Sequence, residues 1–291
     1  MPVLPALKKV QCISPSGLHR MAYWEWAGPT ADAPLLVCVH GLTRQGRDFD
    51  RLAETLSTQY RVISPDVVGR GQSDWLTNPA GYQVPQYVAD MVTLLARLDV
   101  KQVDWVGTSM GGLIGLALAS LPNSPIKKLV LNDIGPALSF EAIQRIGSYV
   151  GQPLSFATVE EGSAYIDVIS ASFGPRTPEQ WARLSEPMFR PDGAGRFKLH
   201  YDPALAIPFK AVTPQIAAAG EAQLWAAYDA IKCPTLLLRG AQSDLLSPET
   251  AKAMTERGPH AGLVQFEGVG HAPMLIQPDQ ISVVQEFLLS P

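Results

Sequence analysis

Short runs of aliphatic and β-branched residues alternate with helical patterns over the first 135 residues or so of the chain. The runs lie at 34–39, 60–64, 103–106 and 126–131, and each predicts a buried strand. Between the second and third runs, apolar residues recur with the spacing of one helix face: Val84, Val88, Met91, Val92, Leu95 and Leu98. Because parallel strands are joined by such crossover helices, the alternation predicts a parallel sheet.

The two ends of the chain complete this pattern. Two segments, 4–13 and 19–27, predict an antiparallel hairpin at the sheet edge, with Pro15 and Gly17 in its turn. After residue 226 the alternation of strands and helices returns. The elements predicted there are strands at 234–239 and 262–266, a helix that starts at Ser247-Pro248-Glu249, and a last amphipathic helix over 281–288.

The middle of the chain lacks this alternation. From about 136 to 225, prolines and glycines interrupt short helical pieces through which aromatic residues are scattered. We therefore expect a mostly helical cap, 136–225, inserted into a core formed by 1–135 and 226–291. Such a cap would supply the far wall of a binding pocket, and the candidate wall residues are Trp181, Phe189 and Trp225. Aromatic residues at such loose spacing pack in a core more often than they line a pocket, so core packing stays open as the alternative.

The strongest local signal for chemistry is Val106-Gly-Thr-Ser109-Met-Gly-Gly112, which follows a predicted strand and opens a helical run. A serine in so sharp a turn has a strained backbone, so the residues two before and two after it must lack side chains. Gly107 and Gly111 meet that requirement. The turn lifts the hydroxyl above the sheet edge, and we expect Ser109 to be a nucleophile.

A serine hydroxyl is a weak nucleophile, so it needs a base, and the base needs an acceptor that fixes its tautomer. His271 follows the last predicted strand in a glycine-rich loop, which favours it among the five histidines. The acid should come from a strand end on the same rim. Asp244, after the strand at 234–239 and a glycine turn, is preferred; Asp133, after the strand at 126–131, is the alternative.

A loop after the first buried strand is the candidate for oxyanion stabilisation. It begins with His40-Gly41-Leu42. We expect the backbone N–H of Leu42 to join that of Met110, which follows the serine, as the two donors of an oxyanion hole. His40 is a further candidate for the pocket wall.

Composition narrows the classes of function. Of the 291 residues 46% are hydrophobic and 17% are charged, which is typical of a folded domain. A net charge of -4 without a basic patch argues against a nucleic-acid partner. No apolar run approaches the roughly 18 residues that span a bilayer, and the start of the chain does not resemble a secretory signal. We therefore expect a cytoplasmic protein without a membrane partner.

The three cysteines carry no signal of metal binding. Cys12, Cys38 and Cys233 are far apart and show neither a CxxC motif nor a Cys/His ligand spacing. We expect reduced thiols and neither a metal nor an organic cofactor.

Taken together, these motifs resemble the α/β-hydrolase family. They occur in the family's order: His40-Gly41, Asp66-Val-Val-Gly-Arg-Gly-Gln-Ser73, the turn at 107–111, Asp244 and His271. The resemblance covers nearly the whole chain outside the cap. It implies an eight-stranded, mostly parallel sheet flanked by helices, with Ser109, Asp244 and His271 as the triad and the helical cap lying over the pocket.

Subfamily features favour a small carboxylic ester or lactone as substrate, cleaved through an acyl-enzyme. Dehalogenases and epoxide hydrolases of the family use aspartate where this chain has Ser109. The carbon–carbon bond hydrolases of ring-cleavage pathways usually carry a Gly- and Pro-rich loop after the HG pair and a tryptophan after the histidine. This chain has Leu42-Thr-Arg-Gln45 and Ala272-Pro273 instead. Carbon–carbon bond hydrolysis and a non-catalytic ligand-binding module stay open as alternatives.

Overall fold

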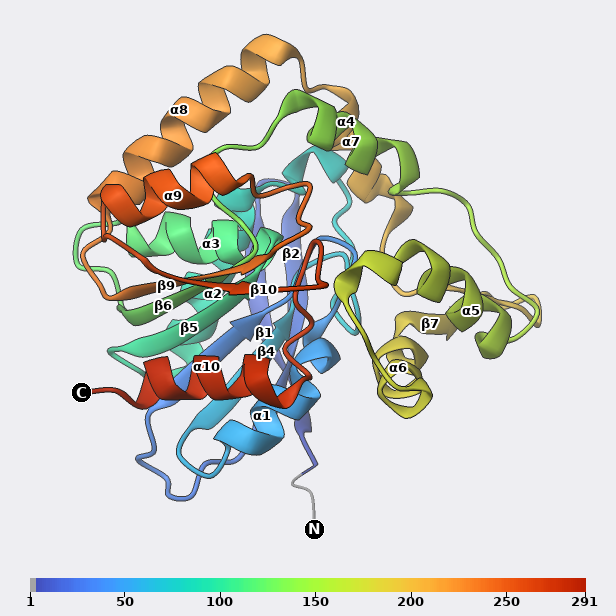
Figure 1. The fold of residues 1–291 in the computed structure, drawn as a ribbon. Helices are drawn as coiled ribbons and strands as arrows, with labels where there is room; N and C mark the ends of the chain where they lie inside the picture. Colours follow the sequence, from blue (N-terminus) through green and yellow to red (C-terminus); the bar gives the residue numbers. More distant parts are fainter. Residues whose placement is uncertain (1–3) are drawn as a thin grey trace.

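A computed structural model describes residues 4–291 (Figure 1). Its main sheet has eight strands in the order β1-β2-β4-β3-β5-β6-β9-β10. The first two pairings of this order are antiparallel and the other five are parallel, so the predicted mostly parallel sheet is confirmed. The strands are β1 (Ala6–Ser14), β2 (Gly17–Trp26), β3 (Leu35–Val39), β4 (Arg61–Asp66), β5 (Val103–Thr108), β6 (Ile126–Asn132), β9 (Thr235–Gly240) and β10 (Gly262–Phe266).

The predicted strands are confirmed, with ends that differ by at most two residues within the parallel part of the sheet. Every residue of β3 is buried, as expected for a parallel strand covered on both faces. The N-terminal hairpin is also confirmed, and Gly17 in its turn has a φ of 123°, which favours glycine.

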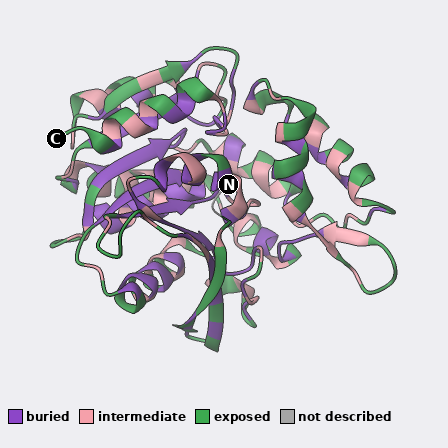
Figure 2. Cartoon of the chain, turned by 90° about the horizontal axis from the view of Figure 1, so that it is seen from below, coloured by how far each residue is buried: buried purple, intermediate pink, exposed green. Residues whose placement is uncertain are grey.

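Helices cover both faces of this sheet. One face packs against α1 (Asp50–Leu56) and α10 (Pro278–Leu289), and the other against α2 (Val84–Leu98), α3 (Met110–Ala119) and α9 (Pro248–Glu256). Figure 2 shows the buried residues gathered in the sheet between these layers. α9 begins as predicted, because the Ser247 side chain accepts a hydrogen bond from the Thr250 N–H. No helix within residues 4–291 has the length and apolar character needed to cross a membrane.

The segment between β6 and β9 is mostly helical. Its larger elements are α4 (Phe140–Tyr149), α5 (Val159–Ile169), α6 (Pro178–Ser185), α7 (Ala206–Lys210), α8 (Pro214–Ala230) and an antiparallel pair, β7 (Phe189–Pro191) and β8 (Phe197–Leu199). Short 3-10 helices of the chain lie at Gly46–Phe49, Pro79–Gly81, Ala171–Phe173, Glu186–Met188 and Pro203–Leu205. In Figure 1, α5, α6 and β7 stand to one side of the main sheet. The β7–β8 pair was not expected from the sequence.

The last helix of this segment reaches the core. The predicted boundary at residue 225 falls inside α8, which continues to Ala230. Tyr228 of α8 is buried, and its hydroxyl donates to the carbonyl of Met254 in α9 at 2.6 Å. The division into core and cap therefore stays a prediction, with α8 as the element that joins the two.

Candidate active site

Ser109 occupies the turn between β5 and α3, with φ 51° and ψ -114°. Its N–H donates to the Asn132 carbonyl of β6 at 3.0 Å, which anchors the turn to the neighbouring strand. The backbones around the turn approach so closely that side chains cannot fit. A Cβ atom at Gly107 would lie 2.3 Å from the Gly111 oxygen, and one at Gly111 would lie 2.0 Å from the Val39 oxygen. The two glycines thus permit the turn that exposes the hydroxyl.

The serine begins a chain of hydrogen-bonded side chains. The Ser109 Oγ lies 3.0 Å from Nε2 of His271, and Nδ1 of His271 lies 2.7 Å from Oδ2 of Asp133. An Nδ1–H that donates to the carboxylate leaves the Nε2 lone pair free to accept the serine proton. The arrangement can therefore deprotonate the hydroxyl and stabilise the imidazolium that results.

The carboxylate of Asp133 is fully buried but well supplied with donors. Oδ1 accepts from the Gly240 N–H at 2.9 Å, and Oδ2 accepts from the Ser243 hydroxyl at 2.6 Å as well as from His271. An ionised carboxylate without partners would be very costly to bury, and these donors offset that cost. The part played by Ser243 was not foreseen from the sequence.

Asp244, the preferred acid, does not lie at the histidine, so that prediction is wrong. Its side chain is 55% exposed and forms an ion pair with Arg145 of α4. Two geometric reasons explain the difference. β6 lies directly beside β5, which carries the serine, and Asp133 immediately follows the last residue of β6. The turn after β9 directs the Ser243 side chain toward Asp133 and leaves the Asp244 side chain exposed.

The loop that carries His271 approaches the end of β9 very closely. A Cβ atom at Gly240 would lie 2.3 Å from the carbonyl oxygen of Gly270, the residue before the histidine. The N–H of Gly270 also donates to the Ser172 carbonyl at 2.5 Å, so the inserted segment contacts the histidine loop directly. The absence of a side chain at Gly240 is therefore a condition for the position of His271.

The predicted oxyanion donors both lie close to the serine. Met110 is the first residue of α3, and Leu42 follows Gly41, where an added Cβ would lie 3.7 Å from the Ser109 Cβ. Within residues 4–291, neither the Leu42 N–H nor the Met110 N–H has a hydrogen-bond acceptor. Two free N–H groups beside a nucleophile are suited to a developing oxyanion.

His40 is buried next to this loop and braces it. Burial lowers the pKa of His40 well below its ordinary value, so the imidazole is neutral. Its Nε2 accepts from the Val67 N–H at 2.9 Å, and its Nδ1 donates to the Gly41 carbonyl at 2.7 Å. His40 thus joins the loops after β3 and β4, and it also lines the smaller cavity described below.

Arg70 makes a second brace from a fully buried position. Its Nε donates to the Leu42 carbonyl at 2.9 Å, and its Nη1 donates to the Tyr87 hydroxyl at 3.0 Å. Its Nη2 lies 3.3 Å from Sδ of Met110. One guanidinium therefore contacts both Leu42 and Met110, the two predicted oxyanion donors.

Two cavities meet at Ser109, and Leu42, Ile146 and Leu245 line both of them. The larger has a volume of about 570 Å³. Its wall is mainly apolar and includes Leu113, Ile134, Leu138, Ile143, Phe209 and Val212. The smaller has a volume of about 130 Å³. Its wall is more polar and includes His271, Arg44, Asp48, Arg145, Tyr149 and Phe173.

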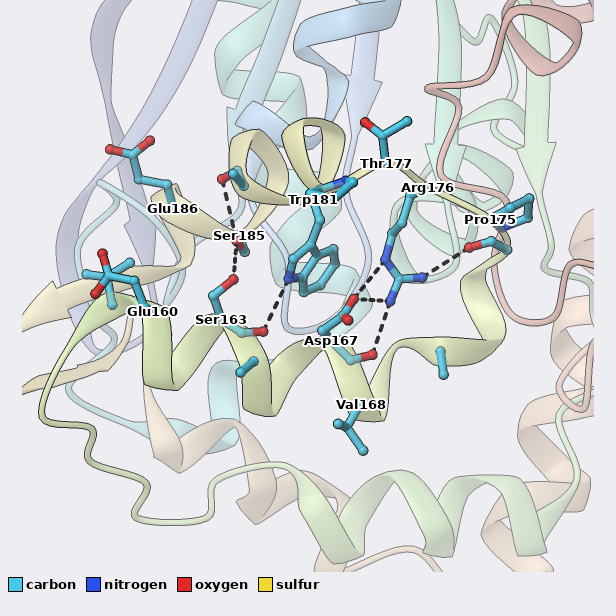
Figure 3. Close-up of a pocket in the computed structure, with 16 residues that line it drawn as sticks. Glu160, Ser163, Asp167, Val168, Pro175, Arg176, Thr177, Trp181, Ser185 and Glu186 are labelled. Carbon is cyan, nitrogen blue, oxygen red and sulfur yellow. Dashed lines mark hydrogen bonds and ion pairs between the residues drawn. The ribbon is translucent and has the colours of Figure 1, made fainter.

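Three aromatic residues predicted for the pocket wall line neither cavity. Trp181 lines a separate cavity of about 1110 Å³ beside α5 and α6, where the Arg176 guanidinium lies 4.6 Å from its ring centroid (Figure 3). The Phe189 ring packs edge-on against Phe156, with centroids 5.8 Å apart. Trp225 packs against the Tyr228 ring and Arg257. These aromatics stabilise the inserted segment and its contact with the core, so the prediction is corrected.

A group of potential metal ligands lies away from the serine. Cys12, His19 and Asp90 are buried between the N-terminal hairpin and α2, with one ligand atom of each within 4.8 Å of the others. The His19 Nε2 lies 3.0 Å from Oδ2 of Asp90. Burial raises the pKa of Cys12 to about 12, which keeps this thiol protonated. His19 and Asp90 therefore pair with each other, and Cys12 lies beside them as a protonated thiol.

Comparisons with known proteins agree with this fold. The family model described as alpha/beta hydrolase fold matches residues 34–159. The chain belongs to the α/β-hydrolase fold family, and it is a hydrolase. It is 56% identical over 291 residues to a 3-hydroxybutyrate-oligomer hydrolase from Cupriavidus necator, with 99% of each chain covered.

Two solved structures are similar over nearly their whole length. A putative hydrolase from Rickettsia typhi has a TM-score of 0.87 and 30% identity, covering 97% of this chain and 98% of that one. An alpha/beta hydrolase from Novosphingobium aromaticivorans has a TM-score of 0.84 and 35% identity, with the same coverage.

Proposed function

We propose that this protein is a serine hydrolase that cleaves short ester oligomers of 3-hydroxybutyrate through an acyl-enzyme. The observation that carries the proposal is the hydrogen-bonded chain Ser109–His271–Asp133, which opens onto two cavities. The identity of 56% to a 3-hydroxybutyrate-oligomer hydrolase supports the substrate class.

In the first stage Ser109 is acylated. Its Oγ attacks the ester carbonyl carbon while Nε2 of His271 takes the hydroxyl proton. The negative charge that develops on the carbonyl oxygen is stabilised by the N–H groups of Leu42 and Met110. Asp133 stays ionised and holds the imidazolium in position.

The first tetrahedral intermediate then collapses: the bond to the alcohol oxygen breaks, the His271 imidazolium donates its proton to this leaving oxygen, and the alcohol departs, which leaves the acyl-enzyme. In the second stage the acyl group is released. A water molecule attacks the acyl-enzyme as His271 takes one of its protons. The tetrahedral intermediate collapses, Ser109 recovers its proton and the carboxylic acid leaves.

The larger cavity suits the body of such a substrate. Its volume of about 570 Å³ lies within the range of roughly 300–1,000 Å³ that small-molecule sites commonly have. An oligomer of 3-hydroxybutyrate has an uncharged body with a methyl group on every unit, so a mainly apolar wall desolvates it at little cost.

The test is hydrolysis of the dimer and trimer of 3-hydroxybutyrate by the purified protein, followed as release of the monomer. We expect turnover by the wild type and by Ser120→Ala, which changes a serine at the far end of α3, and none by Ser109→Ala. A fluorophosphonate should label the wild type but not Ser109→Ala. Turnover of p-nitrophenyl butyrate without turnover of the oligomers would reject the substrate class. Turnover of a vinylogous diketone acid alone would reject ester hydrolysis.

A further inference from the structure

We infer that the smaller cavity is a subsite for one hydroxy-acid unit with a free carboxylate, and that Arg145 of α4 binds this carboxylate. The inference rests on the proposed ester hydrolysis. It gives the substrate a direction: the unit at the carboxyl end of the oligomer is the leaving alcohol, and the rest of the chain is the acyl group.

The direction follows from the position of the base. The leaving oxygen receives its proton from Nε2 of His271, so the alcohol part of the ester must lie on the side of the histidine. His271 lines the smaller cavity but not the larger one, whereas Met110 lines the larger but not the smaller. In an oligomer of hydroxy acids, the alcohol side of every ester leads toward the free carboxyl end. The carboxylate therefore enters the smaller cavity.

The size of this cavity limits what it accepts. Its volume of about 130 Å³ is well below the roughly 300 Å³ at which sites for drug-sized molecules begin. It has room for a short unit but not for an oligomer, whereas the larger cavity has about 570 Å³. The enzyme thus releases one hydroxy acid at a time from the carboxyl end.

Two arginines line the smaller cavity, but only one is available for a substrate. Arg44 is held by Asp48, with its Nε and Nη2 at 2.6 and 2.8 Å from the carboxylate oxygens. The side chains of Arg44 and Asp48 are 15% and 17% exposed. Arg145 instead pairs with Asp244, and these two side chains are 48% and 55% exposed. Exposed pairs of this kind contribute little stability, so a substrate carboxylate can replace Asp244 at small cost.

Arg145 also lies close to the place where the two cavities join. Arg145 lines the smaller cavity, and its neighbour Ile146 lines both. Leu245, which follows Asp244, lines both as well. A guanidinium is planar and donates two parallel hydrogen bonds to a carboxylate, which orients the bound unit as well as attracting it.

The first experiment compares the 3-hydroxybutyrate dimer as the free acid with its methyl ester, in which the carboxylate is blocked. For Arg145→Gln we expect a KM for the free acid about ten-fold higher, with kcat for the free acid and both constants for the methyl ester nearly unchanged. Arg183→Gln is the matched control, because Arg183 is a similarly exposed arginine that pairs with Glu54. Asp244→Asn, which removes the competing carboxylate, should lower the KM for the free acid. Equal effects of Arg145→Gln on both substrates, or no effect, would overturn the assignment.

The second experiment tests the direction and separates the two proposals. A trimer with a chromophore on its terminal hydroxyl should release unlabelled monomer first, and early release of labelled monomer would contradict the direction. Inhibition of p-nitrophenyl butyrate hydrolysis by 3-hydroxybutyrate tests the subsite without an oligomer. If the wild type cleaves no oligomer, the proposed substrate is wrong. Inhibition that Arg145→Gln weakens about ten-fold would still support the carboxylate subsite, and equal inhibition of both proteins would reject it.

Discussion

Replacement of Asp133 by asparagine removes one charge and turns one acceptor into a donor. In the wild type, Oδ1 of Asp133 accepts from the Gly240 N–H, and Oδ2 accepts from His271 and Ser243. An asparagine that keeps its oxygen toward Gly240 places its NH₂ group against Nδ1 of His271. The imidazole must then carry its proton on Nε2, and it can no longer accept the proton of Ser109.

The size of the effect follows from this change of tautomer. Loss of the correct tautomer in a serine triad lowers kcat on the order of 10⁴-fold, which is about 5 kcal/mol of transition-state stabilisation. Asp244→Asn is the matched control. It removes an exposed ion pair worth about 0–1 kcal/mol, so its kcat should stay within a few-fold of the wild type.

The assay is kcat and KM for p-nitrophenyl butyrate at neutral pH, with urea unfolding curves for both variants. We expect Asp133→Asn to remain folded, to bind substrate with a similar KM and to lose nearly all turnover. A near-normal kcat for Asp133→Asn, paired with loss of turnover in Asp244→Asn, would return the role of the acid to the loop after β9.

Three other predictions concern residues outside the triad: Arg70, Gly240 and the buried His200, whose Nδ1 accepts from the Gly71 N–H. Arg70→Met should lower kcat by about 10- to 100-fold through loss of the brace on the oxyanion loop, with partial recovery in Arg70→Lys, and a change in KM alone would contradict this. Gly240→Ala, whose Cβ would lie 2.3 Å from the Gly270 oxygen, should lower both kcat and the free energy of unfolding, the latter by about 1–3 kcal/mol. Gly220→Ala is the control for Gly240→Ala, because a Cβ added at Gly220 contacts no other atom. We expect this control to be about 0.5–1 kcal/mol more stable than the wild type. Burial lowers the pKa of His200 from an ordinary 6.5 to about 3. Between pH 3 and pH 6.5 this histidine is therefore protonated in the unfolded chain but not in the folded one. His200 should therefore make the free energy of unfolding fall as the pH decreases, by up to about 1.4 kcal/mol per pH unit. Urea unfolding at pH 4.5, 5.5 and 6.5 should show this contribution in the wild type but not in His200→Asn.

The sequence alone was sufficient for the features that depend on neighbouring residues. The strand runs, the helix α2 and the capping serine of α9 are all local patterns, and the structure has them where they were predicted, except that Val92 of the predicted apolar face of α2 is exposed. The two glycines around Ser109 belong to the same class, because the strain of that turn is a property of a few consecutive residues. The fold family followed from the order of such local motifs.

Tertiary structure decided which distant side chains meet. Asp133 and Asp244 both follow a strand of the same sheet, and their local patterns do not distinguish them. Which of the two aspartates meets His271 depends on the order of the strands, which puts β6 beside β5. It also depends on the direction that the backbone takes where each of the two strands ends. The pocket role suggested for the aromatic residues of the inserted segment is wrong for a related reason. Spacing along the chain predicts that an aromatic ring is buried, but only the packing of the helices determines whether its neighbour is a substrate cavity or another side chain.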